Sequence, residues 1–183
     1  SHKRASRVEK EGCLAPYIVP LFGSTRDEAI RPRMSERLLA RAPHVTNVPD
    51  GILTAANACT MNDGAAFVAL ASDDWVKAHG AHPMAEIKAV RASGGDAACS
   101  PLMADQAVSQ LLSREGLSYE DIDAFEYNEA FAVISADFME RHPSVKDRLN
   151  CFGGALAYGH PYGASGAEIM IHLMHDRAAA ACS

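Results

Sequence analysis

The sequence has no surplus of basic residues. Among its 183 residues, lysine and arginine together number 17 and aspartate and glutamate 23, which gives a formal net charge of −6. A protein dedicated to nucleic acid needs a basic face that neutralises phosphate groups. The charge balance therefore argues against a nucleic-acid-binding protein.

Long apolar stretches are also missing. The longest unbroken run spans only residues 65–71, whereas a helix needs about 20 apolar residues to cross a bilayer. We therefore expect no membrane span. The overall share of hydrophobic residues is 48%, which is enough for a folded core and excludes a wholly disordered chain.

Cysteines are few and scattered, with no C-x-x-C pair. The five are Cys13, Cys59, Cys99, Cys151 and Cys182. This pattern argues against a disulfide framework and favours an intracellular, reducing compartment, without distinguishing cytoplasm, mitochondrial matrix and peroxisome. The chain starts at Ser1 without Met or a recognisable signal peptide, so we expect a processed or truncated product.

Metal ligands are poorly represented. The close histidine pairs are His79 with His82 and His172 with His175. Neither pair brings the cysteines or carboxylates that would complete a tetrahedral set. We predict no metal site, and a structural or surface role for both pairs.

The order of predicted elements divides the chain into two parts. Residues 1–12 predict a short helix ended by Gly12, and 16–22 a short strand near a sheet edge. A polar connector, with a helical patch over 34–40, follows up to residue 50. Residues 1–50 are thus the end of an N-terminal region with its connector, and residues 51–183 form the main domain, where apolar content rises.

Within the main domain, strands and helices alternate. We expect a run covered on both faces at 65–71, strands at 85–91 and 121–127, a helix from Ser100 to Gly116, a helix that ends at His142 and Pro143, and a mostly buried apolar helix over 168–175. This alternation predicts the α/β class.

Two polar residues interrupt the apolar pattern where the strand at 121–127 meets the next helix. Asn128 and Glu129 occupy this turn, and open α/β sheets bind ligands at such turns, beside a helix N-terminus. From the residues alone, Asn128 is either a helix cap or a side chain that faces a ligand.

A second candidate site is the glycine-rich stretch 153–166. Its glycines let the backbone approach a ligand closely, and His160 lies between Gly159 and Pro161, just before a helix. A histidine there can act as a general base or a hydrogen-bond donor near neutral pH. The alternative is a tight structural loop.

A third, weaker signal is the polar turn at 57–64. Asn62 and Asp63 are typical turn and cap residues, and Cys59 is either a nucleophile or inert packing.

Together, the three motifs resemble the thiolase family in their order and context. The stretch 47–72 resembles the lining of the family's coenzyme A pocket. Residues 128–131 read Asn-Glu-Ala-Phe, a family motif, and residues 153–167 are similar to its Gly-His-Pro motif. The resemblance covers nearly the whole chain. It implies a thiolase-like layered fold, αβαβα in the whole enzyme, of which this chain supplies mainly the C-terminal βαβ half.

The resemblance also implies an activity. Thiolases carry out reversible Claisen condensation and thiolysis of 3-ketoacyl-CoA and acetyl-CoA, with a coenzyme A thioester as substrate and no permanently bound cofactor. By this likeness, Asn128 positions a water in an oxyanion hole, and His160 completes that hole and activates a nucleophilic cysteine. Cys182 would be the acid/base cysteine, and Asn57, Cys59 and Phe131 would contact coenzyme A.

Departures from the family pattern are equally specific. The family's acylated cysteine lies in an N-terminal half that the sequence does not contain, so that half is an expected partner, alongside a homodimer or homotetramer. Cys182 follows His160 at an unusually short distance, and Cys59 and Thr60 replace a Ser-Gly pair common in relatives. The alternatives are a non-catalytic thiolase-like fragment that serves as a binding or assembly module, and a β-ketoacyl synthase, which the motif pair disfavours.

Overall fold

The computed structural model describes residues 1–179, and the side chains of residues 1–175. Its elements are α1 (His2–Glu11), η1 (Ala15–Tyr17), α2 (Glu36–Ala40), α3 (Asp73–His79), η2 (Ala97–Leu102), α4 (Met103–Glu115), η3 (Tyr119–Asp121), α5 (Ala132–Arg141), η4 (Pro143–Val145), α6 (Ala155–Tyr158) and α7 (Ser165–Ala179), where η marks a 3-10 helix.

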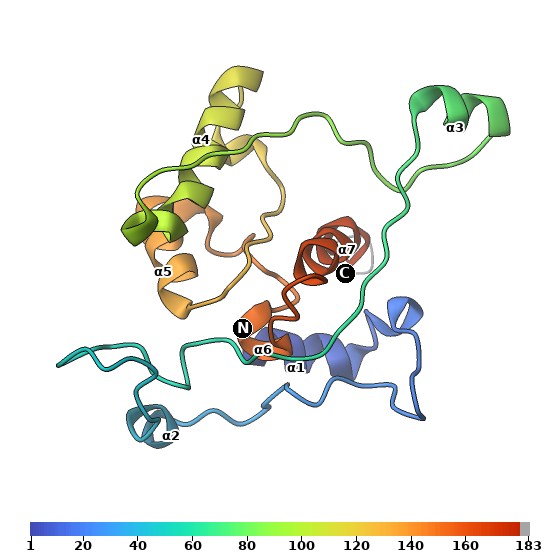
Figure 1. Cartoon of the computed structure of the whole chain (residues 1–183). Helices are drawn as coiled ribbons and strands as arrows, with labels where there is room; N and C mark the ends of the chain where they lie inside the picture. Colours follow the sequence, from blue (N-terminus) through green and yellow to red (C-terminus); the bar gives the residue numbers. More distant parts are fainter. Residues whose placement is uncertain (180–183) are drawn as a thin grey trace.

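Helices gather in two groups. Figure 1 shows α4 and α5 together on one side, and α1, α6 and α7 grouped near the centre. The short helices α2 and α3 lie on long extended segments, away from both groups. The site described below lies where the loops of the two groups meet.

Glycine and proline end the helices where the sequence predicts. Gly12 and Gly116 adopt left-handed conformations, with φ of 70° and 68°, and their N–H groups cap the last turns of α1 and α4. The helix α5 ends at Arg141, directly before His142 and Pro143. These three predicted ends are confirmed.

Aromatic side chains form the larger of two hydrophobic clusters. Phe138 of α5 is 1% exposed and packs with Phe125, Tyr127, Val145 and Leu149. The Phe138 ring centroid lies 4.4 Å from that of Tyr127 and 5.6 Å from that of Phe125. This cluster anchors the chain segment immediately before Asn128.

Alanine at Phe138 is expected to lower the free energy of unfolding by roughly 3–5 kcal/mol, because the truncation removes buried surface and leaves a cavity. The matched control is Phe67→Ala, since Phe67 is 87% exposed and exposed substitutions usually change stability by less than about 0.5 kcal/mol. Urea unfolding of both variants measures the difference. Equal losses would show that Phe138 is not a core residue.

The predicted strands do not form within the described residues. At 65–71, Phe67 and Leu70 are 87% and 72% exposed, so residues 1–179 do not supply the cover expected on both faces of this run. The backbone of residues 85–91 forms no β-bridge, and residues 16–22 contain η1 instead of a strand. An extended segment becomes a strand only when a neighbouring backbone pairs with it along several residues. Among residues 1–179, the bridge between Leu21 and Ser24 is the one backbone pairing that these three segments form.

Of the strand predicted at 121–127, the structure forms one parallel bridge, between Phe125 and Leu149. The N–H of Phe125 donates to the carbonyl of Arg148 at 2.7 Å, and the N–H of Asn150 donates to the carbonyl of Phe125 at 2.8 Å. The helix predicted at 168–175 is present within α7, but Met170 and Leu173 are 36% and 40% exposed, so it is only partly buried.

Candidate functional site

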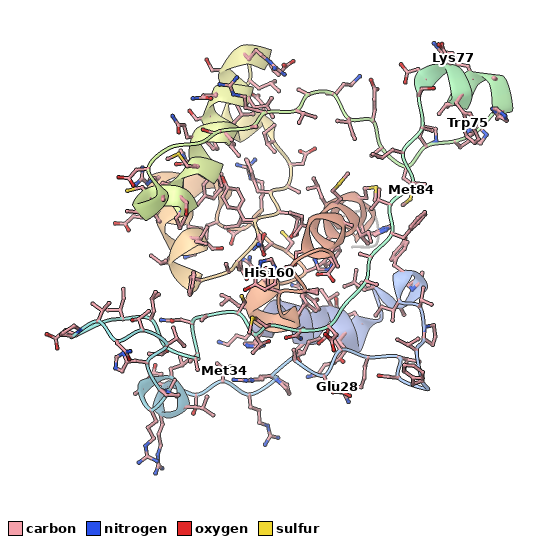
Figure 2. The ribbon with its side chains drawn as sticks, in the orientation of Figure 1. Glu28, Met34, Trp75, Lys77, Met84 and His160 are labelled. Atoms are coloured by element: carbon pink, nitrogen blue, oxygen red, sulfur yellow. The ribbon has the colours of Figure 1, made fainter. Side chains whose placement is uncertain are left out.

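A backbone hydrogen bond of His160 and the glycine before it fix the position of this histidine. It follows α6, and its N–H donates to the carbonyl of Thr60 at 2.8 Å. Gly159 before it has a φ of 91°, and a Cβ there would lie 2.2 Å from the Asn62 side chain. Only glycine permits both this conformation and this close approach. Figure 2 shows His160 near the centre of the molecule.

The turn at 57–62 joins the two motif loops. On one side, the N–H of Cys59 donates to the carbonyl of Ala130 at 2.9 Å, and the N–H of Ala132 donates to the carbonyl of Asn57 at 2.8 Å. On the other side, Asn62 Nδ2 donates to the carbonyl of Tyr158 at 3.0 Å. The structure therefore brings all three sequence motifs together.

Within this arrangement the side chains of His160 and Asn128 meet. His160 Nε2 lies 3.3 Å from Asn128 Nδ2, although 32 residues separate them in the chain. The other ring nitrogen, Nδ1, lies 2.6 Å from Ser165 Oγ. Both His160 and Asn128 are half-buried.

Buried polar groups support the Asn128 loop from behind. Glu129 is 6% exposed and accepts a hydrogen bond from Ser135 Oγ at 3.1 Å. The Asn150 side chain accepts from the N–H of Tyr127 at 2.7 Å and donates to its carbonyl at 3.1 Å. A Cβ at Gly154 would lie 2.7 Å from Glu129 Oε2, so a glycine is needed there too.

Sequence reasoning missed Ser165, Ser135 and Asn150. The only sequence signal for Ser165 is its position five residues after His160, at the start of the next helix. Asn150 offers a weaker one, since it precedes the glycine-rich stretch.

The residues expected to contact coenzyme A have different surroundings. Asn57 uses its side chain within its own turn, where Oδ1 accepts from the N–H of Thr54 at 2.7 Å and Nδ2 donates to the carbonyl of Ile52 at 2.8 Å. Phe131 forms an antiparallel bridge with Ala58. Burial raises the pKa of the Cys59 thiol, which favours the protonated, less nucleophilic form. Cys182 lies outside the described residues.

Two adjoining cavities lie next to the 57–62 turn. One, of about 290 Å³, is lined by residues that include Thr60, Asn62 and Arg31, and the next, of about 460 Å³, is also lined by Arg31 and adds Arg37 and Arg41. Neither cavity is lined by His160 or Asn128. The three arginines can receive an anionic group, because guanidinium groups bind phosphates well.

Two searches of the described residues gave negative results. No group of three or more histidine, cysteine, aspartate or glutamate side chains there is arranged to hold a metal ion. No helix in the same part of the chain is both long and apolar enough to cross a membrane.

Comparison with protein families gives two matches along the chain. The family described as "Thiolase, N-terminal domain" matches residues 1–74, and that described as "Thiolase, C-terminal domain" matches residues 81–181. The predicted boundary after residue 50 stays a prediction.

Curated relatives are similar over almost the entire chain. The 3-ketoacyl-CoA thiolase of Aeromonas hydrophila is 37% identical, over 97% of this chain and 50% of that protein. The cytosolic acetyl-CoA acetyltransferase of Rattus norvegicus is 34% identical, over 96% of this chain and 46% of that protein. The chain thus spans about half the length of the curated relatives it matches.

Solved structures of thiolases are also similar to this chain. The Acat5 thiolase of Ascaris suum in complex with coenzyme A has a TM-score of 0.85 at 33% identity, over 96% of this chain and 46% of that one. Human mitochondrial 3-ketoacyl-CoA thiolase has a TM-score of 0.85 at 31% identity, with the same coverage. This likeness confirms the predicted thiolase-like α/β fold.

Proposed function

The chain belongs to the thiolase family, and from this premise we propose that its protein transfers acyl groups between coenzyme A thioesters. The reaction is reversible Claisen condensation of acetyl-CoA and thiolysis of 3-ketoacyl-CoA. The observation that carries the proposal is the 3.3 Å approach of His160 Nε2 and Asn128 Nδ2 from two separate motif loops.

The negative charge that forms on oxygen during the reaction explains why Asn128 and His160 suit it. Both thiolysis and condensation place negative charge on a thioester oxygen, in a tetrahedral intermediate or an enolate. Donors that are fixed before the reaction stabilise such an oxygen strongly. In the proposed mechanism, Asn128 positions a water at the oxygen, and His160 takes a proton from a cysteine thiol and then donates to the same oxygen.

Substrate binding is proposed along the two cavities. Arg31, Arg37 and Arg41 would bind the phosphates of coenzyme A, and the thioester end would extend past Thr60 toward His160. The contacts with coenzyme A proposed for Asn57, Cys59 and Phe131 would lie outside the two cavities, because none of the three residues lines them. Coenzyme A is a substrate here, and no resident cofactor is proposed.

Other parts of the proposed enzyme come from outside the described residues. The nucleophilic cysteine would come from the N-terminal half, and Cys182 would exchange the proton of the substrate α-carbon. A homodimer or homotetramer is proposed for the whole enzyme. An intracellular, reducing compartment is also proposed, from the scattered cysteines of the sequence.

The full-length protein is expected to convert acetoacetyl-CoA and coenzyme A into two molecules of acetyl-CoA. The reason is that the site presents hydrogen-bond donors for the charged oxygen of both the tetrahedral intermediate and the enolate. Mass spectrometry of the thioester products measures this reaction. Binding of coenzyme A without any acetyl-CoA formed would instead support a non-catalytic thiolase-like binding module.

A further inference from the structure

We propose that Ser165 is a positioning residue that holds the ring proton of His160 on Nδ1 and leaves Nε2 as a hydrogen-bond acceptor. The catalytic meaning of this inference rests on the proposed function. The geometry behind it involves only residues of this chain.

The Nδ1 side of the ring supplies the first argument. Ser165 is the first residue of α7, is 5% exposed, and places Oγ 2.6 Å from His160 Nδ1. The same hydroxyl lies 3.4 Å from the carbonyl oxygen of Pro161, which can only accept. When the hydroxyl donates to Pro161, its lone pairs face His160. Ser165 Oγ then accepts a hydrogen bond from Nδ1–H.

The Nε2 side supplies the second argument. An amide nitrogen donates hydrogen bonds and does not accept them, and Asn128 Nδ2 lies 3.3 Å from Nε2. In this orientation of the amide, Nε2 accepts from Asn128, which favours the neutral ring with its hydrogen on Nδ1. The opposite tautomer would set two donors, Nε2–H and the amide, against each other.

This tautomer suits the two successive tasks proposed for His160. The lone pair on Nε2 can take the proton of a thiol in place of the Asn128 hydrogen bond, so that the S–H bond breaks, an N–H bond forms, and a thiolate and an imidazolium result. The new Nε2–H then donates to the thioester oxygen, and the Asn128 amide turns away from Nε2, because both groups are then donors. Ser165 accepts from Nδ1–H before and after the transfer, so the ring keeps one orientation throughout.

Nuclear magnetic resonance of the histidine ring nitrogens tests the tautomer directly. In full-length protein with isotope-labelled histidine, we expect His160 to be protonated on Nδ1 at neutral pH. His160→Gln assigns the signal. Ser165→Ala is expected to give a mixture of both tautomers, and Ser165→Thr to restore the Nδ1–H form.

The matched control is Ser6→Ala. Ser6 of α1 is 6% exposed, nearly as buried as Ser165 at 5%, and lies outside the three motif stretches. Its removal should leave the His160 tautomer unchanged. A wild-type ring protonated on Nε2, or a Ser165→Ala ring identical to wild type, would overturn the inference. The wild-type spectrum decides even where Ser165→Ala does not fold.

Turnover separates this inference from the proposed function. In the active enzyme, Ser165→Ala should lower kcat roughly 10-fold with little change in KM, the scale of one lost hydrogen bond, and Ser165→Thr should recover most of it. An Nδ1–H ring that depends on Ser165, in a protein without thioester turnover, would support the inference and reject the function. Thioester turnover in a protein whose His160 ring is protonated on Nε2 would support the proposed function and reject the inference.

Discussion

Replacing His160 with alanine is expected to lower the thiolysis turnover of the full-length enzyme by at least about 100-fold. Loss of a general base or of an oxyanion donor has this scale, and His160 is proposed to serve as both. The steady-state rate with acetoacetyl-CoA and coenzyme A measures the effect. Because His160 is half-buried and its loop is held through backbone contacts, the variant should keep its fold.

A second histidine provides the control for this substitution. His82 is exposed and follows the end of α3, so His82→Ala should retain wild-type turnover. Circular dichroism of both variants checks that they are folded. A folded His160→Ala enzyme with near-normal turnover would remove His160 from the proposed mechanism.

The isolated 183-residue chain is expected neither to turn over acetoacetyl-CoA nor to remain a monomer. Large apolar side chains are uncovered along its extended segments: Phe22 is 100%, Phe67 87% and Val90 75% exposed. Contiguous apolar surface beyond a few hundred Å² promotes association. Activity should also be missing, because none of Cys13, Cys99 and Cys151 lies in a motif that could supply the nucleophile.

Sedimentation velocity and a thiolysis assay on the same preparation decide this expectation. A double variant, Phe22→Ser with Val90→Ser, should associate less than the parent chain, because it removes two of the most exposed apolar side chains and leaves the three motif stretches unchanged. Adding the N-terminal half of a relative should reduce association in the parent. A compact monomer with measurable thiolysis would show that the chain is a self-sufficient enzyme.

Local sequence determined most of the helices and the identity of the motif residues. Gly12 and Gly116 end helices because glycine adopts the left-handed conformation at low cost, and that requirement does not depend on the rest of the fold. His142 and Pro143 end α5 for a similarly local reason. Asn128 and His160 were recognisable because a polar residue at a turn between apolar elements, or a histidine between a glycine and a proline, is locally unusual.

Tertiary structure decided the pairing of strands and the geometry of the site. The runs at 65–71 and 85–91 have strand-like composition, but a strand needs hydrogen bonds from another backbone, and composition does not show whether one is present. The Ala58–Phe131 bridge and the Asn128 contact with His160 depend on how distant loops approach. Local sequence does not indicate which side chain faces Nε2 of His160, because Asn128 reaches it from a loop 32 residues away in the chain.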